Sequence, residues 1–197
     1  MEKKKIYEIR MHGRGGQGTV TAANLFIQAA HKQGYAGVQS IPLIGAERRG
    51  SPIRVFARIS EEQIRIHSQI YNPDIVVILD PSLFIKYSQV VLDGLKKDGT
   101  LILNSRRSPQ EIQKTLKNNG LKICSVDATG ISIELGLEVA GQSVVNSPML
   151  GALAKGTGLV KLEQLVDTLR AKWKGKWGEL NIKAVEIAYD RLKCSKD

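Results

Sequence analysis

A glycine-rich stretch near the amino terminus carries residue types suited to binding an anionic or phosphorylated ligand. Residues 12–18 read His-Gly-Arg-Gly-Gly-Gln-Gly, and Gly13, Gly15 and Gly18 fit the spacing G-x-G-x-x-G. After a strand and before a helix, this spacing is typical of dinucleotide sites, in which an acidic residue about 20 positions later holds the ribose hydroxyls. Residues 9–46 contain no Asp or Glu. Because the ribose partner is missing, the motif needs another interpretation.

The loop has the chemistry of an anion site even without a ribose partner. Gly15 and Gly16 leave the backbone unshielded, and the helix that follows offers free N–H groups at the positive end of its dipole. The guanidinium of Arg14 adds a fork of donors suited to phosphate or carboxylate. The alternative is a glycine turn that only packs the helix on the sheet. We therefore expect contacts to an anion or to a partner chain from Arg14, Gly15, Gly16, Gln17 and Gly18.

A second loop combines glycine with adjacent charges. Residues 45–51 read Gly-Ala-Glu-Arg-Arg-Gly-Ser. Arg48 and Arg49 are expected to present two guanidinium groups to an anionic ligand or to a partner's carboxylates. The alternative is a solvated charge cluster, whose exposed ion pairs contribute only about 0–1 kcal/mol.

Residues for catalysis are scarce. The histidines are His12, His31 and His67, and the last two lie in a helical pattern and at a strand end, where structural roles are expected. The sequence contains no G-x-S-x-G elbow, no H-E-x-x-H motif, no Cys/His cluster and no P-loop. Asp80, before Pro81, either holds a ligand hydroxyl or a neighbouring basic residue, or caps a helix. The sequence thus predicts a binding rim without catalytic residues of its own.

The elements that position these residues alternate between strands and helices. The predicted fold is α/β: a Rossmann-like, doubly wound, mostly parallel sheet with an added β-hairpin and a helical C-terminus. Asn146-Ser147-Pro148 is most simply a helix start. Strands are expected at 6–11, 35–41, 53–59, 63–67, 74–80, 100–104 and 121–126, with 53–59 and 63–67 forming the hairpin. Helices are expected at 19–32, 81–95, from Ser108-Pro109 onward, and at 129–139, 149–155, 162–173 and 180–192.

Composition limits the class of protein. The 197 residues are expected to form a single domain, 1–197, and the start Met-Glu-Lys-Lys-Lys predicts no secretory signal and a cytoplasmic protein. The net charge of +10 allows an anionic partner, but basic residues are scattered and aromatic residues make up only 5%. Nucleic-acid binding is therefore disfavoured. Cys124 and Cys194 are expected to be two reduced thiols.

Three stretches together resemble one family. The run Arg10, His12 and Gly13–Gly18 is similar to the R-x-H-G-R-G-G-Q-G loop of the gamma subunit, or gamma domain, of the 2-oxoacid:ferredoxin oxidoreductases. The second loop, with Gly45, Glu47, Arg48, Arg49, Gly50 and Pro52, is similar to that family's G-x-E-R-R-G-x-P. The run 68–74, Ser-Gln-Ile-Tyr-Asn-Pro-Asp, is the third. The resemblance covers residues 5–190 and is strongest to the pyruvate and 2-ketoisovalerate group.

The resemblance implies an activity that this chain cannot carry alone. The family converts a 2-oxoacid, CoA and oxidised ferredoxin to acyl-CoA, CO2 and reduced ferredoxin, as in the pyruvate synthase of anaerobic metabolism. The sequence lacks the G-D-G…N-N pattern for thiamine diphosphate and the C-x2-C-x2-C run of an iron–sulfur domain. Thiamine diphosphate, Mg and [4Fe–4S] clusters are therefore expected in partner alpha, beta and delta subunits, with ferredoxin meeting the complex.

The resemblance leaves open the role of the two loops. One hypothesis is that they contact CoA as co-substrate, with Arg14, Arg48 and Arg49 on its phosphates. The other is that they contact only neighbouring subunits. A stand-alone Rossmann-like nucleotide-binding module is the alternative from another class.

Overall fold

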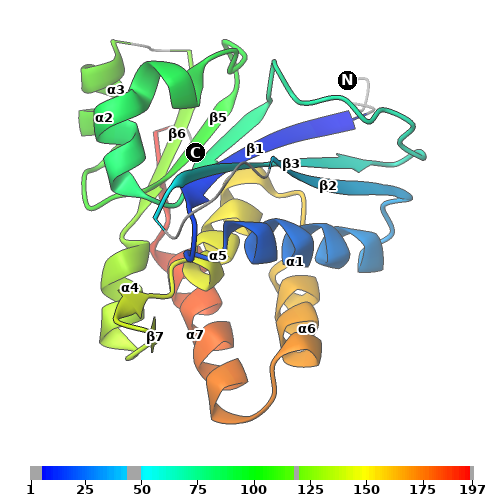
Figure 1. The fold of residues 1–197 in the computed structure, drawn as a ribbon, viewed down its shortest axis with the longest axis vertical. Helices are drawn as coiled ribbons and strands as arrows, with labels where there is room; N and C mark the ends of the chain where they lie inside the picture. Colours follow the sequence, from blue (N-terminus) through cyan, green and yellow to red (C-terminus); the bar gives the residue numbers. More distant parts are fainter. Residues whose placement is uncertain (1–5, 44–49, 118–119, 196–197) are drawn as a thin grey trace.

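A seven-stranded sheet runs through the protein, with helices on both of its faces (Figure 1). The computed structural model describes residues 6–43, 50–117 and 120–195. The strand order is β2-β3-β1-β4-β5-β6-β9, and β1, β4, β5 and β6 run parallel. β2 and β3 form an antiparallel ribbon beside β1, and β9 pairs antiparallel with β6. The predicted α/β fold with a mostly parallel sheet is confirmed. The strands are β1 (Ile6–Arg14), β2 (Gly37–Leu43), β3 (Pro52–Ser60), β4 (Ile75–Ile78), β5 (Thr100–Asn104), β6 (Lys122–Val126) and β9 (Lys193–Cys194).

Two hydrophobic cores separate the helices into two layers. The larger core joins one face of the sheet to α1, α5, α6 and α7, and the smaller joins the other face to α2 and α3 (Figure 1). The helices are α1 (Thr19–Lys32), α2 (Pro81–Leu92), α3 (Pro109–Leu116), α4 (Ala128–Glu134), α5 (Asn146–Thr157), α6 (Leu162–Lys172) and α7 (Gly175–Arg191).

Strand alternation sends the side chains of β1 to two different surroundings. Ile9 and Met11 are buried in the larger core, beneath α1. Arg10 and His12 face the opposite way, and the guanidinium of Arg10 donates to the Val91 carbonyl oxygen of α2. β1 therefore presents apolar side chains to the layer of α1 and polar side chains to the layer of α2.

Local capping chemistry fixes the starts of α2 and α3, as the sequence predicts. Ser108 accepts from the Glu111 backbone N–H while Glu111 bonds back to Ser108, which is a capping box with Pro109 in the first turn. Asp80 caps α2 by accepting from the Ser82 backbone N–H. The interpretation of Asp80 as a helix cap is confirmed.

The predicted hairpin between 53–59 and 63–67 is wrong. β3 pairs with β1 on one side and β2 on the other, and residues 63–67 form no strand. The Ile66 carbonyl oxygen instead accepts from the Gln39 side chain at 2.8 Å. Residues 63–67 cannot pair with β3, because β1 and β2 already occupy both of its edges. Arg58 of β3 is buried rather than half-exposed, held by Glu8 and Gln39.

Two helix boundaries also differ from prediction. The helix expected at 129–139 ends at Glu134, because Gly136 adopts a positive φ of 65° and the chain turns into a small hairpin of β7 (Glu138–Val139) and β8 (Gln142–Ser143). The last helix begins at Gly175 rather than at 180, so most of the expected loop 174–178 is helical.

The expectation of two free thiols is wrong. Cys124 of β6 and Cys194 of β9 form a disulfide, with their Cα atoms 4.1 Å apart. The two residues are direct partners in the β6–β9 register. Sequence separation conceals this pairing, because the cysteines are 70 positions apart in the chain while the sheet places them side by side.

Candidate functional site

The two motif loops meet at the carboxyl end of β1. The Gly15 backbone N–H donates to the Ser51 carbonyl oxygen at 2.9 Å, and the Gly50 N–H donates to the Gly15 carbonyl oxygen at 3.0 Å. The described parts of the two loops therefore lie beside each other. Arg48 and Arg49 lie outside the described residues.

The loop sits at a topological switch point. β1 and β4 are parallel neighbours, and α1 leaves β1 toward one face while α2 leaves β4 toward the other. Ligands in doubly wound folds bind in such a crevice. The strand on the other side of β1, however, is antiparallel β3, so its amino end at Pro52 lies beside the loop. A ribose-binding acid at the carboxyl end of that strand therefore has no place here.

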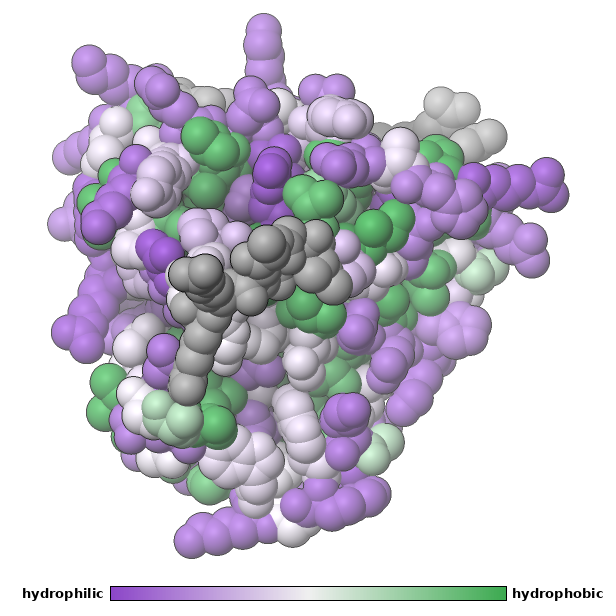
Figure 2. All heavy atoms as spheres, viewed as in Figure 1, coloured by the Kyte–Doolittle hydropathy of each residue, from purple (hydrophilic) through white to green (hydrophobic). Residues whose placement is uncertain are grey.

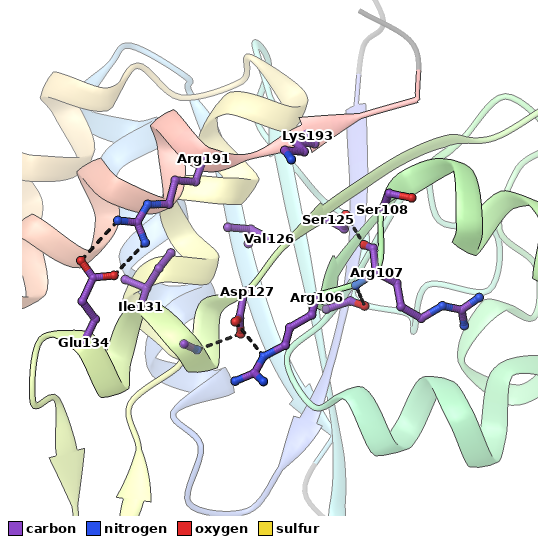
Figure 3. A pocket seen from close by; sticks show the side chains of 12 residues that line it. Arg106, Arg107, Ser108, Ser125, Val126, Asp127, Ile131, Glu134, Arg191 and Lys193 are labelled. Atoms are coloured by element: carbon purple, nitrogen blue, oxygen red, sulfur yellow. Dashed lines mark hydrogen bonds and ion pairs between the residues drawn. The ribbon is translucent and has the colours of Figure 1, made fainter.

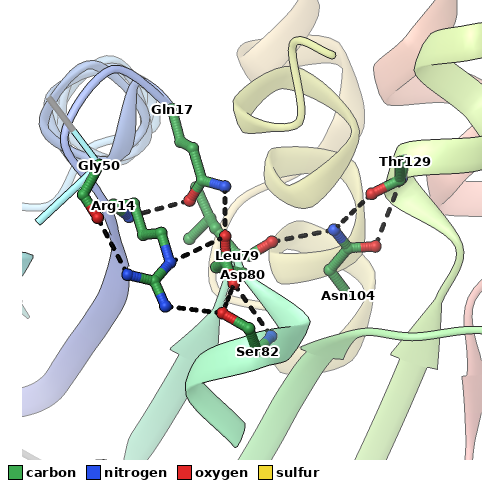
Figure 4. Close-up of polar contacts among 8 residues, drawn as sticks. All are labelled: Arg14, Gln17, Gly50, Leu79, Asp80, Ser82, Asn104 and Thr129. Atoms are coloured by element: carbon green, nitrogen blue, oxygen red, sulfur yellow. Dashed lines mark hydrogen bonds and ion pairs between the residues drawn. The ribbon is translucent and has the colours of Figure 1, made fainter. Parts of the chain in front are cut away.

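On the α2 side of the loop, polar side chains form a closed set that we call the Asp80 network: Arg14, Gln17, Asp80 and Ser82 (Figure 4). Arg14 donates to the Gly50 carbonyl oxygen at 2.9 Å and to Ser82 Oγ at 2.7 Å, and its Nε lies 3.4 Å from Asp80 Oδ2. Gln17 Nε2 donates to Asp80 Oδ2 at 2.7 Å, while Gln17 Oε1 accepts from the Arg14 backbone N–H at 2.8 Å. The network ties the glycine loop to the start of α2.

The ionisation of Asp80 follows from this network. Burial by itself raises the pKa of Asp80, but hydrogen bonds from Ser82 and Gln17 and the charge of Arg14 outweigh it, so the pKa lies below its ordinary value. Asp80 is a carboxylate at neutral pH. It holds a basic residue of the neighbouring loop, which was one of the roles open to it from the sequence.

Two glycines in the loop allow close packing. A Cβ on Gly13 would lie 2.0 Å from Thr19 Oγ1, so glycine is required for α1 to approach β1. Gly18 has a φ of 75°, and a Cβ there would lie 2.7 Å from Asn146 Nδ2. Gly18 thus lets the first residue of α5 lie directly against the loop.

On the opposite side of the loop, a cavity of about 300 Å³ opens between α1, α5, α6 and α7. We call it the tryptophan pocket, because Trp173 and Trp177 form part of its wall. Gly16, Gln17 and Gly18 form its edge at the loop, and Lys172 supplies a cation. Further lining residues are Thr21, Val139, Gln142, Ser143, Val144, Asn146 and Asn181.

The tryptophan pocket contains polar groups without partners. Asn146 is only 5% exposed, and its Oδ1 makes no hydrogen bond in the described part of the chain. The neighbouring Asn181 is different, since it accepts from Ser147 Oγ and donates to the Trp177 carbonyl oxygen. The first N–H groups of any helix lack intrahelical partners. At the start of α1 no side chain caps these groups, and the first turn contains no acidic residue. A ligand with acceptor atoms would satisfy the N–H groups, whereas Asn146 Oδ1 is enclosed and would meet a donor atom of the ligand only after the carboxamide rotates toward the pocket.

The sequence-predicted residues divide between the two sides. Gly16 and Gly18 border the tryptophan pocket, whereas the side chains of Arg14 and Gln17 belong to the Asp80 network. The sequence did not identify Lys172, Trp173 or Trp177 as site residues. No local motif could have identified them, because they lie more than 150 positions from the loop and only the packing of α6 and α7 brings them to it.

The other polar candidates are structural. His31 Nδ1 lies 3.2 Å from the Tyr35 carbonyl oxygen at the end of α1. Within residues 6–43, 50–117 and 120–195, no group of three or more His, Cys, Asp or Glu residues could hold a metal ion. Nor does any helix in those ranges have the length and apolarity needed to cross a membrane.

A larger cavity, of about 500 Å³, lies farther along the same sheet edge, between the carboxyl ends of β5 and β6 and β9 (Figure 3). Its cations are largely engaged: Arg106 pairs with Asp127 at 2.9 Å, and Arg191 pairs with Glu134 at 2.8 Å. Exposed pairs of this kind contribute about 0–1 kcal/mol. Size alone therefore does not make this cavity the better candidate.

Comparisons with known proteins agree on one family. The pyruvate ferredoxin/flavodoxin oxidoreductase family matches residues 8–191. The "pyruvate/ketoisovalerate oxidoreductases common subunit gamma" of Thermococcus kodakarensis is 48% identical over 186 residues, which cover 94% of this chain and 97% of the relative.

Solved structures share the fold. The crystal structure of the pyruvate oxidoreductase subunit PORC from Thermotoga maritima superposes with a TM-score of 0.83 at 36% identity, covering 98% of this chain and 100% of that one. A 2-oxoglutarate:ferredoxin oxidoreductase from Magnetococcus marinus, solved with 2-oxoglutarate, coenzyme A and succinyl-CoA bound, has a TM-score of 0.75. At 18% identity over 95% of this chain and 31% of the other, this likeness shows the fold alone.

Proposed function

The chain belongs to the pyruvate ferredoxin/flavodoxin oxidoreductase family, and we propose that it acts as the gamma subunit of an enzyme that oxidises pyruvate. As a subunit of a 2-oxoacid:ferredoxin oxidoreductase, it takes part in converting a 2-oxoacid and CoA to acyl-CoA and CO2 while ferredoxin is reduced. We propose pyruvate as the 2-oxoacid, with branched-chain 2-oxoacids as the second candidates. Its nearly full-length match to a common gamma subunit supports this role.

The redox and carbanion chemistry belongs to partner chains. Both cysteines are joined in a disulfide, and the described residues offer no cluster of metal ligands, so a [4Fe–4S] cluster or Mg does not fit here. We place thiamine diphosphate, Mg and the iron–sulfur clusters in alpha, beta and delta subunits. Ferredoxin exchanges electrons with the assembled complex.

This subunit's own contribution is a contact to CoA beside the glycine loop. The observation that carries this proposal is the unpaired Asn146 carboxamide beside the uncapped amino terminus of α1. Helix N–H groups and Lys172 suit phosphates, and Trp173 and Trp177 suit a flat aromatic ring. CoA carries both phosphates and a flat aromatic ring, so one ligand suits both the N–H groups with Lys172 and the two tryptophans.

The residues expected from the sequence take two roles in this proposal. The backbones of Gly15, Gly16 and Gly18 approach the ligand. Arg14 and Gln17 hold the loop in position through Asp80. Arg48 and Arg49 complete the site from the second loop, on CoA phosphates or on a neighbouring subunit.

A stand-alone dinucleotide-binding module is not favoured. The antiparallel strand β3 occupies the place beside β1 from which a ribose-binding acid would act. Tight binding of NAD, NADP or FAD by the isolated chain would contradict this conclusion, and a direct titration with each would reveal it.

Steady-state kinetics of the assembled enzyme test the CoA contact. Asn146→Ala and Lys172→Ala are expected to raise the KM for CoA, about tenfold for each 1.4 kcal/mol of lost binding, and to leave the KM for the 2-oxoacid unchanged. Lys183→Ala on the exposed surface of α7 is the matched control. CoA kinetics identical to wild type in fully assembled variants would reject this role for the pocket.

The same measurement on Arg48→Ala/Arg49→Ala separates the two roles of the second loop. A raised KM for CoA with normal assembly supports phosphate binding. Loss of partner chains during purification supports a subunit contact instead.

A further inference from the structure

A mostly apolar groove with a few polar groups lies on the other face of β1 and is not part of the CoA proposal. It has a volume of about 230 Å³ and lies between β1, β3 and α2. We call it the Arg54 groove. Its lining residues are His12, Pro52, Ile53, Arg54, Leu83, Tyr87, Val90 and Val91. Arg10 and His12 belong to the first sequence motif, yet the CoA proposal gives neither a role.

The floor of the groove presents a hydrogen-bond donor. Arg10 Nε donates to His12 Nε2 at 3.1 Å, so that nitrogen of the ring must be an acceptor. Burial, together with the charges of Arg10 and Arg54, lowers the pKa of His12 to about 3, so the ring is neutral. A neutral imidazole whose Nε2 accepts carries its proton on Nδ1. His12 Nδ1 makes no hydrogen bond with any described residue.

The rim of the groove presents an unpaired cation. Arg54 is exposed and lies directly opposite His12 in the β1–β3 register, so both side chains point to the same face of the sheet. It forms no ion pair or hydrogen bond with the described residues. Among residues 6–43, 50–117 and 120–195, none that lines the groove is acidic, although the carboxylate of Asp93 acts on nearby Arg10.

The wall of the groove continues into an exposed apolar helix face. On α2, Ile85 is 76% exposed, Val90 60% and Tyr87 48%. Hydrophobic side chains appear among the hydrophilic ones on the side of the molecule where α2 lies (Figure 2). Tyr87 has non-helical angles, φ −134° and ψ 30°, which kink the helix at the groove. Tyr87 and Val90 line the groove, so their exposed side chains extend its apolar wall to the surface.

We propose that the Arg54 groove and the exposed face of α2 dock a segment of another oxidoreductase subunit, one that carries an apolar side chain next to an Asp or Glu. The apolar side chain fills the space between Leu83, Val90 and Val91. The carboxylate accepts from His12 Nδ1 and pairs with Arg54. This proposal rests on the proposed function, because it requires a multi-subunit enzyme.

Charge and shape select this occupant. The groove has a cation at its rim and a neutral donor at its floor, and its described lining residues include no carboxylate. Such a groove is complementary to an acidic group. A second copy of this chain is a poorer match, since its net charge is +10. A free small carboxylate would fill the groove but leave Ile85 uncovered.

Co-purification tests the proposal. The chain is co-expressed with the other subunits of its enzyme, and their recovery through tagged gamma subunit is compared for Arg54→Glu and Val90→Asp. Both residues are exposed, so thermal unfolding of the isolated variants should stay close to wild type. We expect at least a tenfold loss of one partner subunit, and for Arg54→Glu the loss should be largest at low salt, where charge interactions are least screened.

Matched controls change the same residue types away from the groove. The controls are Arg170→Glu and Ile133→Asp. Arg170 has an exposed side chain on α6, and Ile133 on α4 is 55% exposed. Both should retain all partner chains. Normal recovery of every subunit with Arg54→Glu and Val90→Asp would overturn the proposal.

Photo-crosslinking identifies the occupant. A benzophenone amino acid at position 87 of the assembled enzyme should crosslink to a partner peptide that contains an apolar residue beside Asp or Glu. A crosslink to a second gamma chain would overturn the proposal. The proposal would also be overturned if the subunits assembled normally with a substituted groove while free isovalerate or pyruvate bound to the wild-type complex in an Arg54-dependent manner. Failure of wild-type gamma subunit to recover any oxidoreductase subunit would instead reject the proposed function.

Discussion

The two sides of the glycine loop differ in how completely their polar groups are satisfied. In the Asp80 network, Arg14, Gln17 and Ser82 all bond to one carboxylate, so each of these side chains already has a partner within the protein. In the tryptophan pocket, a buried amide oxygen and the amino end of α1 have no partners. The Asp80 network is therefore structural, and the tryptophan pocket is the side that can bind a ligand. Unsatisfied groups, rather than the number of cations, indicate where a partner binds.

If the Asp80 network is structural, removing its centre should cost the most stability. Asp80→Ala leaves Arg14 and Gln17 without their acceptor and α2 without its cap, so we expect a loss of about 3 kcal/mol in the free energy of unfolding. Denaturant unfolding measures this loss. Asp80→Asn keeps an acceptor for the Ser82 backbone and should lose less. A loss below about 1 kcal/mol for Asp80→Ala would show that the network does not hold the loop.

The same face should respond to acid through His12. Its pKa of about 3 lies below the unfolded value, so the unfolded chain binds the proton more tightly and stability falls as the pH drops below about 6.5. From pH 6.5 to pH 5, we expect a loss of about 2 kcal/mol from this group. His12→Gln retains an acceptor for Arg10 and does not titrate, so its unfolding free energy should depend less on pH. Parallel pH profiles for the two proteins would contradict this.

Gly18 separates the two sides, and its replacement should measure how tightly they pack. Gly18→Ala places a methyl group 2.7 Å from Asn146 Nδ2 at a positive φ of 75°. Gly158→Ala has a similar φ of 66° with nothing within 4 Å, so it carries only the backbone cost, about 1 kcal/mol. We expect Gly18→Ala to lower the free energy of unfolding by about 1 kcal/mol more than Gly158→Ala does. Equal unfolding free energies would mean that Asn146 moves aside freely.

The smallest effect on stability should come from the receptive side. Because Asn146 Oδ1 has no partner, Asn146→Ala removes an unsatisfied buried acceptor, and the isolated chain should change by no more than about 1 kcal/mol, toward either greater or unchanged stability. Thermal unfolding of the isolated subunit measures this. A clear loss of stability would show that Asn146 supports the fold and would remove the contrast between the two sides.

The sequence predicted those features that depend on local pattern. The strand before Asp80 and the helix start at Ser108 were predicted correctly, and a helix cap was one of the roles left open for Asp80. Strand burial and helix capping are decided within a few residues. The hairpin prediction for 63–67 failed because a pattern of alternating arginines resembles a half-exposed strand. Arg58 is buried only because Glu8 and Gln39 come to it from other strands.

The sequence by itself determined the family motifs, the alternating α/β order and the absence of an acidic residue where a dinucleotide would need one. Tertiary structure alone decided which face of the loop is open, which cysteines meet, and that Trp173 and Trp177 border the same loop. The physical reason is that satisfaction of a polar group depends on what packs against it. Those neighbours come from helices and strands that are distant in the chain and adjacent only in the folded protein.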